Sequence, residues 1–521
     1  MQLEKWKRSP EVLAAVSAFA VGVFSHCFAL VNPIHNYDNI LQHPQGVGAG
    51  VTSGRWMLDL LGDFNTQFLD MNYNLPFPKG LALILLIAVS AGFLVNVLKI
   101  QNRVSAGLLG CLLVTFPTVC STMVFRYTAE YYGLALLLSV LAVWVVDRSK
   151  FGIIWSAVCL ACSMGIYQAY APFTIGLFLL LLIRQSLQPD ARLSSLIARG
   201  FYYCGAIILG VAMYFVMVKV GLALYSTNEE VVLDTYLGIN NMGKISLDRL
   251  PRLIKRAFSY GALFAVRNYC GLAPHAVLKL AWCLLILGIV AIIGVIVVKK
   301  KIGILNVLFC GMMGLLFPLG INFQMIMSPD FMPYTIMVYS IVLVGCAPLM
   351  LLECLPENLG LGRCSWRQIV AALLLLISLY NAYYTNYNYT ALHYANRQVE
   401  NYLNSLTTQV RMTEGFTAEK KWVLIGEIHD PMLWNQWNED LYFGGFINCS
   451  AKGLLRATYS LHAWFNTYLG IGVPFASESE TRQMMENAQV DQMECWPNAG
   501  SVQVIDDYVV IKFQQIDEIK P

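Results

Sequence analysis

Residues 32 to 44, NPIHNYDNILQHP, follow the first apolar run and bring carboxylate, imidazole and phenol groups together. The carboxylate of Asp38 is flanked by His35 and Tyr37, which are candidate substrate-binding residues. A carboxylate at this place can take the proton of an attacking hydroxyl, provided that it is ionised when the reaction needs a base. The segment is also rich in turn-forming residues, so a solvated turn without a catalytic role is the alternative interpretation.

A candidate anion-binding group follows in TSGRWMLDLLGDF. Apolar residues at positions 56, 57, 60, 61 and 64 predict a helix that lies on a membrane surface, with Ser or Thr as its N-cap. Arg55 then lies at the helix N-terminus, where backbone N–H groups and the helix dipole favour a phosphate, and Trp56 suits the membrane interface. An ion pair of Arg55 with Asp59, four residues on, is the alternative.

Two more polar clusters occur at the ends of apolar runs. Glu130, in FRYTAEYYG, starts the fourth run, and an ionisable group at that depth is costly enough to indicate a function. Arg126 can pair with it, which would need no substrate. In GIYQAYAP, Tyr167 and Gln168 offer an aromatic face and hydrogen-bonding groups that suit a sugar ring, although tyrosines also gather at membrane interfaces without a ligand.

The segment RLPRLIKRAF, residues 249 to 258, is basic and amphipathic. Leu250, Leu253, Ile254 and Phe258 are expected on one side of a helix at the membrane surface. Its basic residues, Arg256 among them, are candidates for holding a lipid phosphate. General attraction to anionic headgroups explains the pattern as well.

The composition identifies an integral membrane protein, because 57% of the 521 residues are apolar and 13% are charged. Runs of about 20 apolar residues recur, the length that a helix needs to cross a bilayer. The sequence therefore predicts a polytopic all-α membrane protein with about eleven transmembrane helices. They are expected at Val12–Val31, Leu81–Leu98, Ala106–Phe125, Tyr131–Val146, Ile153–Tyr167, Pro172–Leu187, Phe201–Ala223, Val277–Val298, Ile304–Asn322, Pro333–Leu352 and Ile369–Tyr389.

Basic residues predict the orientation of these helices. Lys5, Lys7 and Arg8 precede the first run and place the N-terminus in the cytoplasm, as an uncleaved anchor or, alternatively, a cleavable signal peptide. Five alternate loops are also basic, so loops 32–80 and 224–276 and the C-terminal part are expected outside. The polar mass is thus extracytoplasmic, and we expect the chemistry there.

The C-terminal part, residues 390–521, is expected to form a small extracytoplasmic α/β domain beside a transmembrane catalytic domain of residues 1–389. TALHYANRQVENYLNSLTTQVRM has helical spacing, and KWVLIGEI and SVQVIDDYVVIKF predict strands. Cys449 and Cys495 are candidates for a disulfide in an oxidising exterior, with two unpaired thiols as the alternative.

Several function classes lack their motifs. The chain has no Walker loop and no dinucleotide-binding fingerprint, and its seven histidines show no metal-ligand spacing. ATP-driven transport and zinc-dependent hydrolysis are therefore disfavoured. No cofactor is expected, and a divalent metal at the acidic site stays an open alternative.

The order and common sidedness of YDN, GRW, AEYYGLALLL and YQAY resemble the bacterial membrane glucosyltransferases of the serotype-conversion type, in the GT-C superfamily. The resemblance covers about residues 10 to 390. It implies an inverting transfer of glucose from a polyprenyl phosphate, typically undecaprenyl phosphate, to a cell-surface polysaccharide or lipid-linked glycan outside the bacterial cytoplasmic (inner) membrane. No nucleic acid is an expected partner.

The resemblance also implies roles for residues. Asp38 would be the general base, Glu130 a second acid that orients acceptor or donor, and Arg55 and Arg126 ligands of the donor phosphate. Family members often have a second acid where this chain has Asn39, which puts a bound metal in doubt.

Two other functions are alternatives to this transfer. A transporter or flippase of a lipid-linked sugar should show internal repeats and charged residues near the bilayer midplane, whereas here the charges lie at the predicted outer rim. A phosphoethanolamine-type transferase would need a nucleophilic Ser or Thr with clustered metal ligands outside, which the C-terminal part does not offer.

Overall fold

The computed structural model describes most of the chain, in two compact units. The described residues are 9–41, 50–70, 74–225, 232–244, 246–328, 330, 333–355, 360–361, 364–428, 433, 450–456 and 458–519. The first unit comprises residues 1–32, 47–386 and 442–444, and the second comprises residues 33–46, 387–441 and 445–521. The segment around Asp38 thus groups with the C-terminal part of the chain.

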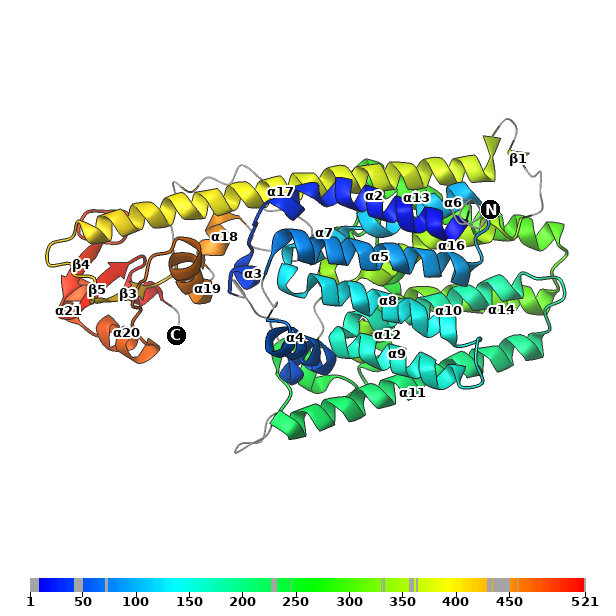
Figure 1. Ribbon diagram of the computed structural model, residues 1–521, viewed down its shortest axis with the longest axis horizontal. Coiled ribbons are helices and arrows are strands. Elements are labelled where there is room, and N and C mark those ends of the chain that lie inside the picture. The colour runs from blue at the N-terminus through cyan, green and yellow to red at the C-terminus, as the bar shows by residue number, and fades with distance from the viewer. Residues whose placement is uncertain are drawn as a thin grey trace. The chain divides into compact units, whose positions relative to one another are not determined.

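Apolar helices make up most of the first unit (Figure 1). They are α2 (Pro10–Val31), α5 (Pro76–Leu98), α6 (Arg103–Thr115), α7 (Pro117–Val124), α8 (Ala129–Val145), α9 (Gly152–Ile166), α10 (Ala171–Ser186), α11 (Leu193–Tyr225), α13 (Ala276–Lys299), α14 (Ile304–Gly320), α16 (Leu343–Leu352) and α17 (Trp366–Arg411). The 3-10 turns η6 (Thr335–Met337) and η7 (Tyr339–Val342) precede α16, and a two-residue ladder of β1 (Gly360–Leu361) with β2 (Cys364–Ser365) precedes α17.

Within the described ranges, seven helices are long and apolar enough to cross a membrane, or eight if the bent pair α6 and α7 forms one span. The bend of 41° falls at Phe116, whose extended backbone is the conformation that a following proline, Pro117, favours. Shorter apolar helices at Gly152–Ile166, Ile304–Gly320 and Tyr339–Leu352 correspond to three other predicted spans. A mostly helical protein with several potential membrane spans is confirmed, and the number of eleven stays a prediction.

Two predicted elements differ from the structure. The last predicted span and the helix expected after it are one helix, α17, of 46 residues. No glycine or proline interrupts residues 366–411, so nothing in the sequence ends the helix between its apolar and its amphipathic parts. The span predicted at Pro333–Leu352 begins instead with η6 and η7, and its α-helical part, α16, has 10 residues.

Small residues allow the helices of the first unit to pack closely. Helix α2 contacts α5 and α6, α8 contacts α5 and α9, and α11 contacts α9, so that α2, α5, α8, α9 and α11 follow one another as neighbours (Figure 1). A Cβ atom on Gly22 of α2 would lie 2.6 Å from Val114 and 2.7 Å from Ile84. Such close helix contacts at small residues are typical of membrane proteins.

The second unit combines short helices with a three-stranded sheet. Besides the C-terminal part of α17, it contains α3 (Tyr37–Leu41), α18 (Ala451–Arg456), α19 (Thr458–Ala463), the π-helix η8 (Trp464–Tyr468), α20 (Glu478–Met485), α21 (Ala488–Asp491), β3 (Lys421–Ile425), β4 (Val502–Ile505), β5 (Tyr508–Lys512) and η9 (Ile516–Glu518). The strand order is β3-β5-β4, with β3 parallel and β4 antiparallel to β5. The small C-terminal sheet is confirmed at both predicted strand segments.

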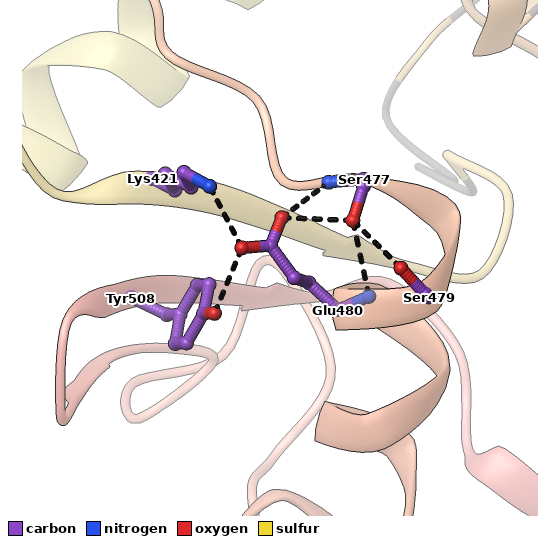
Figure 2. Close-up of polar contacts among 5 residues, drawn as sticks. All are labelled: Lys421, Ser477, Ser479, Glu480 and Tyr508. Carbon is purple, nitrogen blue, oxygen red and sulfur yellow. Dashed lines mark hydrogen bonds and ion pairs between the residues drawn. The ribbon is translucent and has the colours of Figure 1, made fainter.

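Glu480 ties α20 to this sheet (Figure 2). Its Oε1 accepts hydrogen bonds from Lys421 Nζ at 2.7 Å and from the Tyr508 hydroxyl at 3.1 Å. Its Oε2 accepts from the backbone N–H of Ser477 at 2.7 Å and from the Ser477 hydroxyl at 2.9 Å. The Ser477 hydroxyl oxygen accepts from the Glu480 backbone N–H at 3.3 Å, which completes a capping box. The hydrogen bond from Lys421, with those from Ser477, lowers the pKa of Glu480 from its ordinary 4.5 to about 2.

This lowered pKa predicts that the junction between α20 and the sheet weakens in acid. Ionised Glu480 stabilises the folded form above about pH 4.5, and the stabilisation is lost as the pH falls toward 2. We expect amide exchange of residues 477–485 in the full chain, corrected for the intrinsic pH dependence, to accelerate over this interval. In Glu480→Gln, the same amides should already exchange fast at pH 7 and show no further acceleration in acid. If the acceleration in acid is the same in Glu480→Gln as in the wild type, Glu480 is not its cause.

Candidate functional site

A predicted surface helix and the turn before it begin the site. Helix α4 (Trp56–Phe68) follows the 3-10 turn η1 (Val51–Ser53), which confirms the predicted helix. The predicted Ser or Thr N-cap is wrong, because Arg55 itself is the N-cap residue and Ser53 is buried in η1. Gly54, at φ +70°, ends η1 in the left-handed region, so α4 starts only after it.

Hydrogen bonds hold this turn against a second 3-10 turn, η3 (Gln168–Tyr170), and against the apolar helix α11. The amide Nε2 of Gln168, in η3, donates to the carbonyl of Ser53 at 2.8 Å and to the hydroxyl of Tyr214 at 2.9 Å. The Tyr214 hydroxyl, on α11, donates to the carbonyl of Gly54 at 3.1 Å. The turn that carries Arg55 is therefore fixed to the YQAY corner and to α11.

Gly54→Ala should destabilise this turn. A Cβ atom at position 54 would lie 2.5 Å from the Tyr214 hydroxyl and 2.9 Å from Gln168 Nε2, and alanine is disfavoured at φ +70°. We expect a loss of about 1–3 kcal/mol of stability, seen as a lower thermal unfolding midpoint of the purified full chain. The matched control is Gly288→Ala on α13, where a Cβ meets nothing within 4 Å; equal midpoints for the two variants would refute the role of Gly54.

The Arg55 guanidinium packs on an aromatic stack. Its central carbon lies 4.8 Å from the ring centroid of Tyr167, which stacks on Tyr132 at 4.5 Å and 1°. The alternative ion pair is not formed, since Arg55 and Asp59, both described, make no salt bridge. Arg55 Nε is buried without a hydrogen-bond partner. The guanidinium therefore keeps one N–H donor that the protein does not use.

Arg55 lines a partly open pocket in the first unit, which holds about 530 Å³ of space with open solvent included. Tyr167 and Gln168 line it too, so three predicted site residues meet there. The other lining residues come from η3, η6 and two further elements, η4 (Tyr236–Asn241) and α15 (Gln324–Met327), each with the residue that follows it. They are Ala169, Ile239, Met242, Gln324, Met327, Ser328 and Met337. We call this cavity the Arg55 pocket. A mostly apolar wall with a few polar groups is typical of a small-molecule site.

Trp56 lies next to the pocket but is not part of its wall. A Cβ atom on Gly165 of α9 would lie 2.5 Å from the Trp56 indole, so the glycine makes room for this ring. The indole Nε1 is buried without a hydrogen-bond partner. The interfacial role and the substrate-binding role of Trp56 both stay predictions.

Glu130 forms an ion pair that the sequence interpretation missed. Its Oε1 pairs with Lys79 Nζ, from the first turn of α5. Lys79 is buried, and its Nζ lies 5.3 Å from the ring centroid of Tyr131. Glu130 Oε2 is buried without a hydrogen-bond partner. In the sequence, Lys79 is only one basic residue in LPFPKG, at the predicted outer end of the second apolar run.

Arg126 and Glu130 do not line the Arg55 pocket. Arg126, in η2 (Arg126–Thr128), is buried with 1% of its surface exposed. Glu130 lies in the first turn of α8, four residues further on. Their proposed contacts with acceptor or donor are therefore separate predictions from those of the pocket residues.

The segment around Asp38 is built within the second unit. The Asn396 side chain on α17 accepts from the His35 N–H at 2.7 Å and donates to the His35 carbonyl at 2.8 Å. The Asn36 amide oxygen then accepts the N–H groups of Asp38 at 3.1 Å and Asn39 at 2.6 Å, which caps the first turn of α3. Asp38 itself is half-buried in this turn.

The two candidates beside Asp38 pack against aromatic residues of the same unit. The His35 ring, 2% exposed, lies 5.4 Å from Tyr468 and 6.2 Å from Trp464. The Tyr37 ring lies 6.4 Å from Tyr459. These contacts fix the backbone that carries Asp38, and substrate binding by His35 and Tyr37 stays a prediction.

Arg256 lies on the predicted basic helix, α12 (Leu250–Ala262). The expected apolar side is divided. Leu253, Ala257 and Gly261 are buried, whereas Ile254 and Phe258 are 40% and 36% exposed, and they line an open groove. The reason is that Gly261 packs directly on the Pro318 backbone of α14, which turns the smallest residues of α12 inward. Arg256 is exposed and outside the wall of the Arg55 pocket.

The structure bears differently on the possible metal site and on the predicted disulfide. In the part of the chain that the structure describes, no three His, Cys, Asp or Glu side chains are grouped as a metal would need. Cys449 lies outside the described residues, so its disulfide with Cys495 stays a prediction. Lys5, Lys7 and Arg8, which predict the orientation, also lie outside them.

A family model matches more than half of the chain. The family model described as Glucosyl transferase GtrII matches residues 27–345, a range that contains Asp38, Glu130 and the whole Arg55 pocket. No curated protein and no solved structure matches the chain.

Proposed function

The chain belongs to the GtrII glucosyl transferase family, and from this we propose that it moves glucose from a polyprenyl phosphate to a cell-surface polysaccharide. The family is the serotype-conversion type that the sequence motifs resemble. With its potential membrane spans, the chain is a membrane glycosyltransferase. The proposal includes the donor and the acceptor. It also includes a GT-C fold with eleven spans in the bacterial inner membrane, with the N-terminus inside and the site on the extracytoplasmic side.

The Arg55 pocket is the observation that supports a phosphate-linked sugar donor. It joins a cation whose Nε lacks a partner to the aromatic face of Tyr167 and the amide of Gln168. A guanidinium suits a phosphate, and an aromatic face with amide groups suits a sugar ring. Arg55 would bind the donor phosphate, assisted by Arg126, while Tyr167, Gln168 and Trp56 position the sugar.

The proposed reaction is a single inverting displacement. The acceptor hydroxyl attacks the anomeric carbon as Asp38 takes its proton, and the bond from that carbon to the phosphate oxygen breaks with both electrons on the leaving polyprenyl phosphate. Arg55 and Arg126 stabilise the charge that develops on it, and Glu130 orients acceptor or donor. His35 and Tyr37 would bind the acceptor beside Asp38, and Arg256 the lipid phosphate during its approach. The proposal needs no cofactor.

Reconstitution tests the donor class. The full chain in liposomes is supplied with an O-antigen-type polysaccharide and with radiolabelled glucose on either undecaprenyl phosphate or uridine diphosphate. We expect label on the polysaccharide only from the lipid-linked donor. Transfer from the nucleotide alone would refute the proposal, and movement of the lipid-linked sugar across the bilayer without transfer would identify a flippase.

A further inference from the structure

Gln324 lies in the wall of the Arg55 pocket and carries a buried hydrogen-bond acceptor without a partner. It begins α15, lines the pocket and is 3% exposed. Its Oε1 is buried and has no hydrogen-bond partner. Buried acceptors are almost always satisfied in folded proteins, so an exception in a cavity wall indicates a group that a ligand satisfies.

The orientation of this amide is fixed by its neighbours. The Nε2 of Gln324 donates to the carbonyl of Met337 at 3.3 Å, and a carbonyl can only accept. Nε2 also donates to Asn322 Oδ1 at 3.2 Å. Asn322 is itself oriented, because its Nδ2 donates to the carbonyl of Ala257 at 3.2 Å and its Oδ1 accepts from the Tyr269 hydroxyl at 3.0 Å. A reversed Gln324 amide would place oxygen against oxygen, so Oε1 is the atom without a partner.

Two residues of the pocket wall thus carry buried, unpartnered polar atoms of opposite hydrogen-bonding character. Arg55 Nε is a cationic donor without a partner, and Gln324 Oε1 is a neutral acceptor without a partner. A phosphodiester has no proton to give to an amide oxygen, so it suits Arg55 alone. A hydroxyl group can donate to Gln324, whereas an ionised carboxylate there would face another acceptor.

We propose that Gln324 is a specificity-determining residue whose amide oxygen accepts a hydrogen bond from one hydroxyl of the donor sugar. The inference rests on the proposed function, because it takes the pocket ligand to be a sugar phosphate. It adds a selection rule: neutral hexoses with that hydroxyl are accepted, and the corresponding deoxysugar, or a uronic acid with its carboxylate at that position, is rejected.

Binding of deoxysugar donors tests the proposal directly. The probes are glucose and its 2-, 3-, 4- and 6-deoxy forms on a short polyprenyl phosphate, titrated calorimetrically into the full chain in detergent. For the wild type we expect one deoxy form to bind about 10-fold more weakly than glucose, the factor that one buried hydrogen bond carries. If all four deoxy forms bind as tightly as glucose, the proposal is overturned without any variant.

A variant of Gln324 tests whether this residue causes the difference in binding between the glucose donor and the deoxy form. Gln324→Met keeps the side-chain length and removes the amide, so glucose and the deoxy form should bind equally within about 2-fold. The matched control is Gln188→Met, because Gln188 donates to the Arg184 carbonyl at 3.3 Å and lies outside the pocket wall; its discrimination should equal that of the wild type. If Gln324→Met does not fold, Gln324→Ala replaces it. Discrimination that persists in the folded Gln324 variant overturns the proposal.

The binding assay and the transfer assay distinguish a failure of the inference from a failure of the proposed function. Hydroxyl-dependent binding that Gln324→Met abolishes, in a chain that transfers no glucose, would leave the inference standing and refute the proposed function. Transfer with no hydroxyl-dependent binding would refute the inference alone. A wild type that binds none of the five donors would overturn the inference, and the liposome assay would then decide the function.

Discussion

Asp38→Asn should lower glucose transfer by about 100-fold or more, with lipid-linked donor and polysaccharide both at saturating concentrations. The substitution keeps the shape of the side chain and removes the base, and a lost general base costs about 10²–10⁴ in rate. The Asn36 amide that caps α3 accepts from backbone N–H groups, so the turn itself should survive the change. The measurement is single-turnover transfer of label in proteoliposomes.

The control for this variant is an aspartate away from the proposed site. Asp147→Asn removes an exposed ion pair with Arg199, whose atoms lie 3.0 Å apart, and exposed pairs contribute little to stability. We expect transfer within about 2-fold of the wild type. A loss below 10-fold for Asp38→Asn, in protein that is folded and binds donor, would assign the base to another residue.

Arg55→Met should lower kcat/KM for the lipid-linked donor by about 100- to 1,000-fold. One preorganised group that stabilises developing charge typically contributes this much. Methionine fills the space over Tyr167 without a charge, so the loss reports on the guanidinium and not on packing alone. Arg55→Lys should recover part of the activity, because it keeps the charge and loses the planar fork that stacks on the ring.

A second stacked arginine provides the comparison. The guanidinium carbon of Arg148 lies 4.2 Å from the ring centroid of Trp144, the same type of contact outside the Arg55 pocket. Arg148→Met should leave kcat/KM within about 2-fold of the wild type. If both methionine variants lose activity equally, the effect of Arg55→Met is a loss of stability, and its role toward the phosphate is refuted.

Elements with a strong local pattern were predictable from the sequence. Helices α4 and α12 follow from apolar residues at helical spacing, and β3, β4 and β5 follow from short β-branched runs between turns. The ends were harder to predict. The N-cap position of Arg55 depends on the left-handed backbone of Gly54, and TSGRW does not show where the 3-10 turn stops.

The Arg55 pocket was predictable in part. Arg55 is a candidate because it lies at the N-terminus of the predicted surface helix, and Tyr167 and Gln168 because they lie at the predicted outer end of an apolar run. The structure brings these three together. Gln324 has the same placement, directly after α14, but one amide in INFQMIM has no distinguishing pattern. Its significance depends on which of its atoms Asn322 and Met337 satisfy, and tertiary packing alone decides that.

The partner of Glu130 shows the same limit of local reasoning. Arg126, four residues away, was the nearest basic residue in sequence, whereas Lys79 pairs with Glu130 from 51 positions away. Helices α5 and α8 pack along their length, and this contact brings the two first turns together. Sequence distance is therefore a poor guide to ion pairs between packed helices.

The central claim is that Asp38 and Arg55 act on one lipid-linked sugar. Cryo-electron microscopy of the full chain with a non-transferable phosphonate analogue of polyprenyl phosphate glucose tests it most directly. We predict phosphonate oxygens within hydrogen-bonding distance of the Arg55 guanidinium, and the Asp38 carboxylate on the opposite face of the anomeric carbon, with room for an acceptor hydroxyl between them. A phosphonate bound away from Arg55, or an Asp38 carboxylate directed away from the anomeric carbon, would contradict the account.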